Sequence, residues 1–337
     1  MKKQFLTVGV VLTTAFFPLR SLAANFTGLY VFGDSLSDPG NVFNLTKAFT
    51  GTGSPPPPYS EGRFSNGQIW TSYFAQDLGL SPVPATTLPF LPVPPTQGIN
   101  FAFGGATTGP DNTITPLLPG LTQQVETFTT LLQGRPADPN ALYVVWAGAN
   151  DYLPTESKTF TPYTNPKTSI RNLSNTISSL AALGARNFLV ANQSNLGQVP
   201  IAAIAGDPVA LSKLSDRHNA RLNKTIQSFE RKLPDSTFYL LDIHALFAQA
   251  FNGQFGFTNV TVPCISQGAF PTCPGYLFWD QYHPTEAAHQ KIADLALQTV
   301  NATPTPEPAS VPEPASGIAL LAFGIASAVT MRRAKAS

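Results

Sequence analysis

The sequence predicts an α/β fold, a three-layer α/β/α sandwich around a mostly parallel central sheet. Short apolar segments alternate along the chain with longer segments of helical periodicity. The short segments are apolar throughout, which is typical of parallel strands covered by helices on both faces. Apolar residues make up 43% of the 337 residues, enough for the large core that such a sandwich needs.

Four apolar segments are expected to be strands. They are followed by polar or small residues, among which are Ser35 after the first and Asn150 after the second. In open parallel sheets, ligands bind beyond the carboxyl ends of the strands, so both side chains are expected on that rim. The four segments are residues 29–33, 142–146, 187–191 and 237–242.

Four further segments have the spacing of amphipathic helices. Two of them end at a glycine, Gly79 and Gly184, the residue type that commonly ends helices. Pro284 is expected in the first turn of the last helix, where a missing amide is tolerated. The four segments are residues 68–78, 169–183, 208–233 and 284–300.

Two Pro-rich segments, residues 51–60 and 81–97, are expected to be irregular. Connecting segments of this kind run over the surface, and we expect these two to lie near the rim and to shape access to it. Several aromatic residues elsewhere are expected chiefly in the core, and some are candidates to line an acyl pocket. They are Phe101, Phe103, Trp146, Phe278 and Trp279.

Composition excludes some classes of function. Only 12% of residues are charged, the net charge is +1, and the globular region contains no basic run. The chain therefore has no electrostatic footprint for nucleic acid, and no nucleic-acid partner is expected. No two histidines have zinc-site spacing, so neither a metal nor another cofactor is expected.

The only two cysteines, Cys264 and Cys273, lie close together in the sequence. In an oxidising compartment they are candidates for a disulfide, and the alternative is a pair of free thiols. The N-terminus favours such a compartment. Residues 1–24 have a basic start, a short apolar middle and a small-residue end, the pattern of a secretory signal peptide, with cleavage expected after Ala23 or Ala24.

The C-terminus has three parts. A Pro-rich linker at 301–316 is followed, within residues 317–337, by an apolar segment and then by a basic tail. This order, with Val311-Pro312-Glu313-Pro314 before the apolar segment, resembles the PEP-CTERM sorting tail of exported bacterial proteins. The resemblance implies processing by an exosortase of a Gram-negative bacterium and a place in the periplasm, cell envelope or outside the cell. The apolar segment is a candidate to cross the membrane, or alternatively to be a buried helix.

The residues with candidate chemistry lie at the two ends of the globular region. A serine hydroxyl needs a base to become a nucleophile, and a histidine base needs an orienting group. Ser35 follows a buried strand, and Asp280 precedes His283 by three residues. Together they indicate a catalytic triad for ester hydrolysis. Candidate donors for the oxyanion are the amide of Ser35, the glycine-rich turn at 100–106, and Asn150.

Four short motifs resemble, in order, the sequence blocks of the GDSL hydrolases, also called the SGNH family. They are Gly33 to Asn41, Asn100 to Ala106, Gly148 to Asp151, and Asp280 to His283, and residues 62–67 (Gly-Arg-Phe-Ser-Asn-Gly) are similar to a segment of the lipase-type branch. The resemblance spans about residues 28 to 300.

This resemblance implies a flavodoxin-like fold with Ser35 as nucleophile, His283 as base and Asp280 behind it. It implies Ser35, Gly105 and Asn150 as oxyanion donors, with Gly105 favoured over its neighbour Gly104 by its spacing from Asn100. Other polar residues are expected to have structural roles only. Those residues are Asp38, Asn41, Arg63, His218, His244 and His289.

Residues 25–300 are thus expected to form an exported serine hydrolase domain that cleaves carboxylic esters through an acyl-enzyme. The expected substrate is a lipid, aryl or carbohydrate ester. An alternative is a carbohydrate acetylesterase or acyltransferase that acts on extracellular polysaccharide. A second alternative, from another class, is a non-catalytic surface protein that binds carbohydrate.

Overall fold

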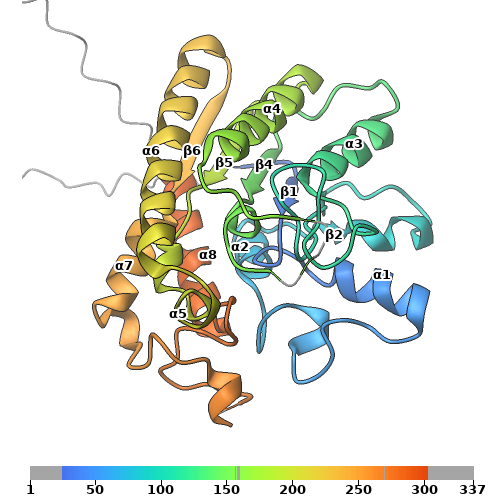
Figure 1. Cartoon of the computed structure of the whole chain (residues 1–337). Coiled ribbons are helices and arrows are strands. Elements are labelled where there is room, and N and C mark those ends of the chain that lie inside the picture. Colours follow the sequence, from blue (N-terminus) through green and yellow to red (C-terminus); the bar gives the residue numbers. More distant parts are fainter. Residues whose placement is uncertain (1–24, 156, 158–159, 269, 303–337) are drawn as a thin grey trace, which may run out of the picture. The chain divides into compact units, whose positions relative to one another are not determined.

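Six parallel strands form the central sheet of the protein (Figure 1). The computed structural model describes residues 25–155, 157, 160–268 and 270–302. Within these ranges the strand order is β2-β3-β1-β4-β5-β6. Without the edge strand β2, this is the flavodoxin-like order. The strands are β1 (Leu29–Gly33), β2 (Val83–Pro84), β3 (Gly98–Asn100), β4 (Leu142–Trp146), β5 (Asn187–Ala191) and β6 (Thr237–Leu241).

Helices cover both faces of the sheet (Figure 1). Because side chains alternate along a strand, successive residues of β4 enter opposite layers of the core. Val144 packs with α2, α7 and α8 on one face, and Val145 packs with α3, α4 and α6 on the other. The α-helices are α1 (Asn41–Thr50), α2 (Trp70–Asp77), α3 (Leu121–Leu132), α4 (Lys167–Leu183), α5 (Pro200–Ala205), α6 (Pro208–Lys232), α7 (Ile243–Phe251) and α8 (Glu286–Asn301).

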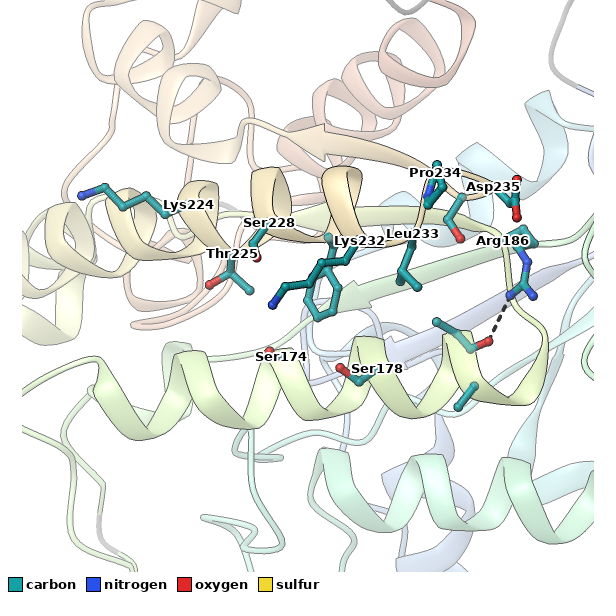
Figure 2. A pocket seen from close by; sticks show the side chains of 14 residues that line it. Ser174, Ser178, Arg186, Lys224, Thr225, Ser228, Lys232, Leu233, Pro234 and Asp235 are labelled. Carbon is teal, nitrogen blue, oxygen red and sulfur yellow. Dashed lines mark hydrogen bonds between the residues drawn. The ribbon is translucent and has the colours of Figure 1, made fainter.

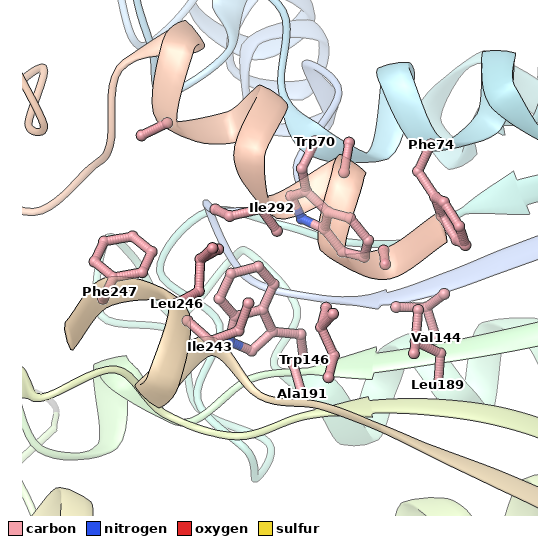
Figure 3. Close-up of a cluster of buried hydrophobic side chains, with 14 of the residues drawn as sticks. Trp70, Phe74, Val144, Trp146, Leu189, Ala191, Ile243, Leu246, Phe247 and Ile292 are labelled. Carbon is pink, nitrogen blue, oxygen red and sulfur yellow. The ribbon is translucent and has the colours of Figure 1, made fainter. Parts of the chain in front are cut away.

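The first of these two layers supports the strand ends where the candidate site is expected. Figure 3 shows Trp146 of β4 between Trp70 of α2 and Ile243 of α7. The Trp70 and Trp146 rings meet edge to face at 5.6 Å, and both side chains are almost fully buried. Burying a large apolar side chain contributes about 1.5–3 kcal/mol, so this layer holds the end of β4 firmly against two helices. The predicted α/β/α sandwich is confirmed.

The strands and helices that the sequence predicted match the structure closely, but helices α3 and α7 were not predicted. Strands β1, β4 and β5 have the predicted bounds, and β6 ends one residue earlier, at Leu241. The prediction for the start of the last helix was wrong. Helix α8 begins at Glu286, and Thr285 caps it by accepting a hydrogen bond from the Ala288 N–H. Pro284 precedes this cap, where its carbonyl accepts a hydrogen bond from Ser65 Oγ at 3.0 Å.

The topology places one edge of β1 beside β3 and the other beside β4. The strand order reverses at this point, and in doubly wound sheets ligands bind at the carboxyl ends of the strands there. Ser35 follows β1 and Asn150 follows β4. The fold therefore brings both predicted rim residues to the switch point.

The chain divides into two units after Ala302, and the second unit lies outside the described residues. The same is true of the predicted signal peptide and of the PEP-CTERM-like tail with its apolar segment. Among the helices that the structure does describe, none is both long enough and apolar enough to cross a bilayer.

Candidate active site

Ser35 lies in the turn that follows β1, and two contacts fix where that strand ends. Gly33 leaves no room for a side chain, because a Cβ there would lie 2.5 Å from the Trp146 carbonyl oxygen. Gln124 of α3 donates to the Gly33 carbonyl at 2.8 Å and accepts from the Gly33 N–H at 2.9 Å. The turn that carries Ser35 thus starts from a strand end held on both sides.

Three predicted residues from opposite ends of the globular region form one chain of hydrogen bonds. Ser35 Oγ lies 2.8 Å from His283 Nε2, across 248 positions of sequence. His283 Nδ1 lies 2.7 Å from Asp280 Oδ2 and 2.9 Å from Oδ1. With a proton on Nδ1, the imidazole donates to Asp280 and can accept the Ser35 proton at Nε2. This is the arrangement that general-base activation of a serine requires.

The Asp280 carboxylate is held ionised by its surroundings. Its Oδ1 accepts from the N–H groups of Tyr282 and His283, both at 2.7 Å, and its Oδ2 accepts from the Tyr59 hydroxyl at 2.8 Å. Burial would raise the pKa of Asp280, but the nearby His283 and these donors more than offset it, and the pKa lies below its usual value. The carboxylate can therefore orient His283 and stabilise its charged form.

A disulfide closes the loop that precedes Asp280. Cys264 and Cys273 are bonded to each other in the structure, with Cα atoms 5.7 Å apart. The Cys264 N–H donates to the Phe278 carbonyl at 2.9 Å, and both cysteines pack in one cluster with the buried Trp279, the residue before Asp280. The cross-linked loop is thus packed directly behind the carboxylate.

Three groups that can donate to an oxyanion lie beside Ser35. The N–H groups of Ser35 and Gly105 form no hydrogen bond with any described residue, and both residues line the same cavity as Asn150. Asn150 Nδ2 donates one of its hydrogens to the Ala106 carbonyl at 3.0 Å, which leaves the other for a ligand. The Gly104 N–H donates instead to Asp38 Oδ2 at 2.8 Å. The geometry therefore agrees with Gly105 as the candidate donor.

Gly105 also needs to be a glycine. Its φ of +76° is a left-handed conformation, and a Cβ there would lie 2.6 Å from Asn112 Oδ1. Asn112 Nδ2 in turn donates to the Gly104 carbonyl at 2.8 Å. A larger residue would displace this turn and its amides.

Asp38 and Asn41 tie the turn after β1 to the turn after β3, in agreement with the structural role expected for them. Asp38 accepts from the backbone N–H groups of Gly40, Asn41, Val42 and Gly104. Burial raises the pKa of Asp38 to about 6, against the lowering effect of these four donors. Asn41 Nδ2 donates to the carbonyls of Asn100 and Ala102 at 2.9 and 3.0 Å. The Ser35 and Gly105 turns are thus held together as one unit.

Asp34 is a buried carboxyl that the sequence analysis did not single out. Its Oδ1 accepts from the Leu36 N–H at 3.1 Å, and its Oδ2 has no partner among the described residues. Burial raises the pKa of Asp34 to about 7, an effect that the Leu36 amide and His283 partly oppose and Asp151 reinforces. A group beside Ser35 therefore changes charge near neutral pH.

Sequence reasoning also missed Tyr59 and Phe64. Tyr59, which donates to Asp280, comes from a Pro-rich segment in which no spacing or motif marks it. The Phe64 ring packs at 5.1 Å from the His283 ring, and Phe64 lies inside the family-like 62–67 segment. Its place in that segment was the sequence signal that could have identified Phe64 as a site residue.

The remaining histidines lie outside this hydrogen-bond chain. His218 Nδ1 lies 2.8 Å from the Tyr152 hydroxyl, and His244 Nδ1 lies 3.3 Å from Asn219 Nδ2. Burial lowers the pKa of His218 to about 4 and, together with His283, lowers that of His289 to about 3. Arg63 donates from Nε to the Gly67 carbonyl at 3.0 Å, as expected for a loop anchor.

The candidate site opens into a cavity of about 210 Å³, which we call the catalytic cavity. Besides the groups above, it is lined by apolar side chains that include Leu36, Ile114 and Leu153. No residue of 51–60 or 81–97 is among the described residues that line it, so the expectation that these Pro-rich segments shape access stays a prediction. The first segment contributes through Tyr59, behind Asp280, instead.

A larger cavity, of about 680 Å³, lies elsewhere between α4 and α6 (Figure 2). We call it the α4–α6 groove. Its lining within the described chain includes Arg186, Lys224, Lys232 and Asp235 but none of Ser35, Asp280 and His283. Volume alone therefore does not identify the site with the chemistry.

A hydroxyl, an imidazole and a carboxylate linked at the switch point of a parallel sheet, beside free amide donors, are typical of α/β/α hydrolases. Comparison with known proteins narrows this class. Residues 29–296 match the family model described as GDSL-like Lipase/Acylhydrolase. The chain belongs to this family and is a carboxylic ester hydrolase.

Known relatives are 26–28% identical to this chain over most of its length. A GDSL esterase/lipase of Arabidopsis thaliana is 28% identical over 314 residues, covering 80% of this chain and 85% of that one. A phosphatidylcholine-sterol acyltransferase of Aeromonas hydrophila is 26% identical over 323 residues, covering 80% and 89%. Among solved structures, an aryl esterase of M. smegmatis has 17% identity and a TM-score of 0.43, covering 81% of this chain and 97% of that one.

Proposed function

We propose that this ester hydrolase works through an acyl-enzyme on Ser35 and acts outside the cytoplasm. The observation that supports the mechanism most directly is the hydrogen-bond chain from Ser35 Oγ through His283 to Asp280, with distances of 2.8 and 2.7 Å. Heavy-atom distances of this size allow proton transfer without movement of the backbone.

In the first half of the proposed reaction, His283 Nε2 takes the Ser35 proton while Oγ attacks the ester carbonyl carbon. The carbonyl oxygen becomes an oxyanion, which accepts hydrogen bonds from the N–H groups of Ser35 and Gly105 and from Asn150 Nδ2. The C–O bond to the alcohol then breaks. His283 returns its proton to that oxygen, and the alcohol leaves.

In the second half, water replaces the alcohol. His283 takes a proton from the water as its oxygen attacks the acyl carbon, and the same three donors hold the second oxyanion. The bond between the acyl carbon and Ser35 Oγ breaks, His283 returns the proton to Oγ, and the carboxylic acid leaves. Asp280 remains ionised throughout and stabilises the imidazolium formed in each half.

Trapping of the nucleophile tests this mechanism. We expect a fluorophosphonate to add one covalent group at Ser35, located by peptide mass spectrometry, and Ser35→Ala to lose both the label and about 10⁴-fold or more in kcat on p-nitrophenyl butyrate. Ser37→Ala is the matched control, since it removes a neighbouring hydroxyl that accepts from Trp70 Nε1, and it should keep the label. Labelling of another residue with Ser35 unmodified would remove Ser35 from its role.

The Cys264–Cys273 disulfide supports the proposed location, because such bonds persist in oxidising compartments and are rare in the cytosol. The signal-peptide pattern of residues 1–24 points the same way. Expression with its own N-terminus in a Gram-negative host tests this. We expect the periplasmic or medium fraction to hold a chain that begins at Ala24 or Asn25 and lacks free thiols. A chain retained in the cytosol with residue 1 intact would contradict export.

A further inference from the structure

A second, smaller cavity adjoins the catalytic cavity. It has a volume of about 30 Å³, and we call it the annex. Its lining is largely apolar and comes mostly from the loops at the carboxyl ends of the strands, with Trp146 of β4 and with Ile243 and Phe247 of α7, which are labelled in Figure 3. The residues that line it away from the catalytic cavity include Trp146, Leu196, Val199, Ile243, Phe247 and Phe278.

Four residues line both cavities and so form the wall between them: Leu36, Ala149, Leu153 and Tyr282. Three of the four are direct sequence neighbours of Ser35, Asn150 or His283. Leu153 is the exception. It is 6% exposed, and its N–H donates to the Ala149 carbonyl at 3.0 Å, so its backbone is fixed. Leu153 is therefore the wall residue whose size can change with the least effect on the reacting groups.

The direction of the reaction indicates which part of an ester faces this wall. In the proposed mechanism the alcohol must leave and water must enter, and both need the side of the cavity that is open to solvent. Ile114, which is 47% exposed, marks that side. The acyl group stays on Ser35 between the two halves, so it is the group that a closed apolar end can hold.

We propose that the acyl chain lies in the catalytic cavity and points toward the annex. The Leu153 side chain closes the annex off from this chain and so sets a preference for short acyl chains. This inference rests on the proposed acyl-enzyme mechanism. The catalytic cavity of about 210 Å³ is smaller than the ~300–1,000 Å³ of common ligand pockets, in agreement with a short chain. Removal of the Leu153 side chain joins the two cavities and extends the space available to the chain.

A chain-length series tests this. With p-nitrophenyl acetate, butyrate and octanoate, we expect the wild-type kcat/KM to fall at octanoate. Leu153→Ala should raise the octanoate-to-acetate ratio of kcat/KM by about tenfold or more, since single methylenes in apolar pockets change specificity by ~10–200-fold. Leu211→Ala is the matched control, because Leu211 is equally buried, at 5%, and lines neither cavity. It should leave the ratio unchanged.

A double variant distinguishes entry of the longer acyl chain into the annex from a general loosening of the active site. Val199 lines the annex but not the catalytic cavity. If the longer chain enters the annex, Val199→Phe in the Leu153→Ala background should return the ratio toward the wild-type value. An unchanged ratio in folded Leu153→Ala, or a gain that Val199→Phe does not reverse, would overturn this inference while Ser35 labelling still stands. Absence of Ser35 labelling in the wild type would instead remove the mechanism on which it rests.

Discussion

The catalytic cavity and the α4–α6 groove differ in the way that matters for chemistry. The groove is about three times larger, at 680 against 210 Å³. Its polar groups do not converge: Lys224, Lys232 and Asp235 are exposed, and Arg186 Nη1 donates to one carbonyl in the last turn of α4 and to one just after it (Figure 2). In the smaller cavity, a hydroxyl, an imidazole and free amides face one point.

Convergence of fixed polar groups, more than cavity volume, distinguishes the reactive site. Burying a polar group without a partner is costly, so the carboxylates that position the reacting groups are held by specific contacts. Asp280 has four donors and Asp38 ties two turns together. An exposed lysine, in contrast, loses side-chain entropy whenever a ligand orders it.

The largest effect is expected at the carboxylate behind the base. Asp280→Asn should lower kcat/KM on p-nitrophenyl butyrate by about 10³–10⁴-fold, because an amide neither selects the Nδ1–H tautomer nor stabilises imidazolium. Tyr59→Phe removes only one of the donors to Asp280 and should cost about tenfold or less. A loss below tenfold for Asp280→Asn would show that His283 does not depend on Asp280.

The next largest effect is expected at Asn150, which follows β4 and whose side-chain amide lies beside Ser35. Asn150→Ala should lower kcat by about 10²–10³-fold with little change in KM, because an oxyanion donor acts mainly in the transition state. Steady-state kinetics on the same ester provide the measurement, with circular dichroism to exclude loss of fold. A rise in KM at constant kcat would instead make Asn150 a binding residue.

Sequence reasoning predicted the parts of this site that local patterns encode. β1, β4 and β5 are continuous apolar runs, and Ser35, Asn150 and His283 lie in recognisable motifs. Strands β2 and β3 were missed because, at two and three residues, they are too short to show a period. Helix α1 was missed because it begins inside the first motif, at Asn41.

Contacts between distant segments that no motif marks could not be predicted in the same way. Tyr59 reaches Asp280 across 221 positions, and neither residue's neighbours in sequence indicate the pair. The annex wall likewise depends on packing between the turns after β1 and β4 and the loop before α8. Such features follow from tertiary geometry, which hydrophobic periodicity does not contain.

A smaller effect, on stability, is expected from the buried carboxyl of the catalytic cavity. The pKa of Asp34 is raised to about 7 in the folded state, so between pH 4 and 7 the folded chain holds a proton that the unfolded chain has released. The contribution of this group to stability therefore falls as pH rises through that range. Asp34→Asn should gain stability relative to wild type between pH 5 and 8.5, by up to ~3 kcal/mol.

Urea unfolding at the two pH values measures this difference, and other buried groups cancel because both proteins share them. Asp235→Asn, which changes an exposed carboxylate of the α4–α6 groove, is the matched control and should follow the wild-type pH dependence. Equal pH dependence of wild type and Asp34→Asn would mean that Asp34 is already ionised at pH 5 in the folded protein.

The smallest effect is expected in the larger cavity. Lys224→Ala and Lys232→Ala remove exposed side chains that no hydrogen bond or ion pair holds within the described chain, so each should change stability by no more than ~0.5 kcal/mol. Hydrolysis of p-nitrophenyl butyrate should stay within about twofold of wild type, because neither ammonium contributes to the catalytic cavity. A loss of kcat comparable to that of Asn150→Ala would mean that the groove is coupled to the reaction, and convergence around Ser35 would then be insufficient to define the functional site.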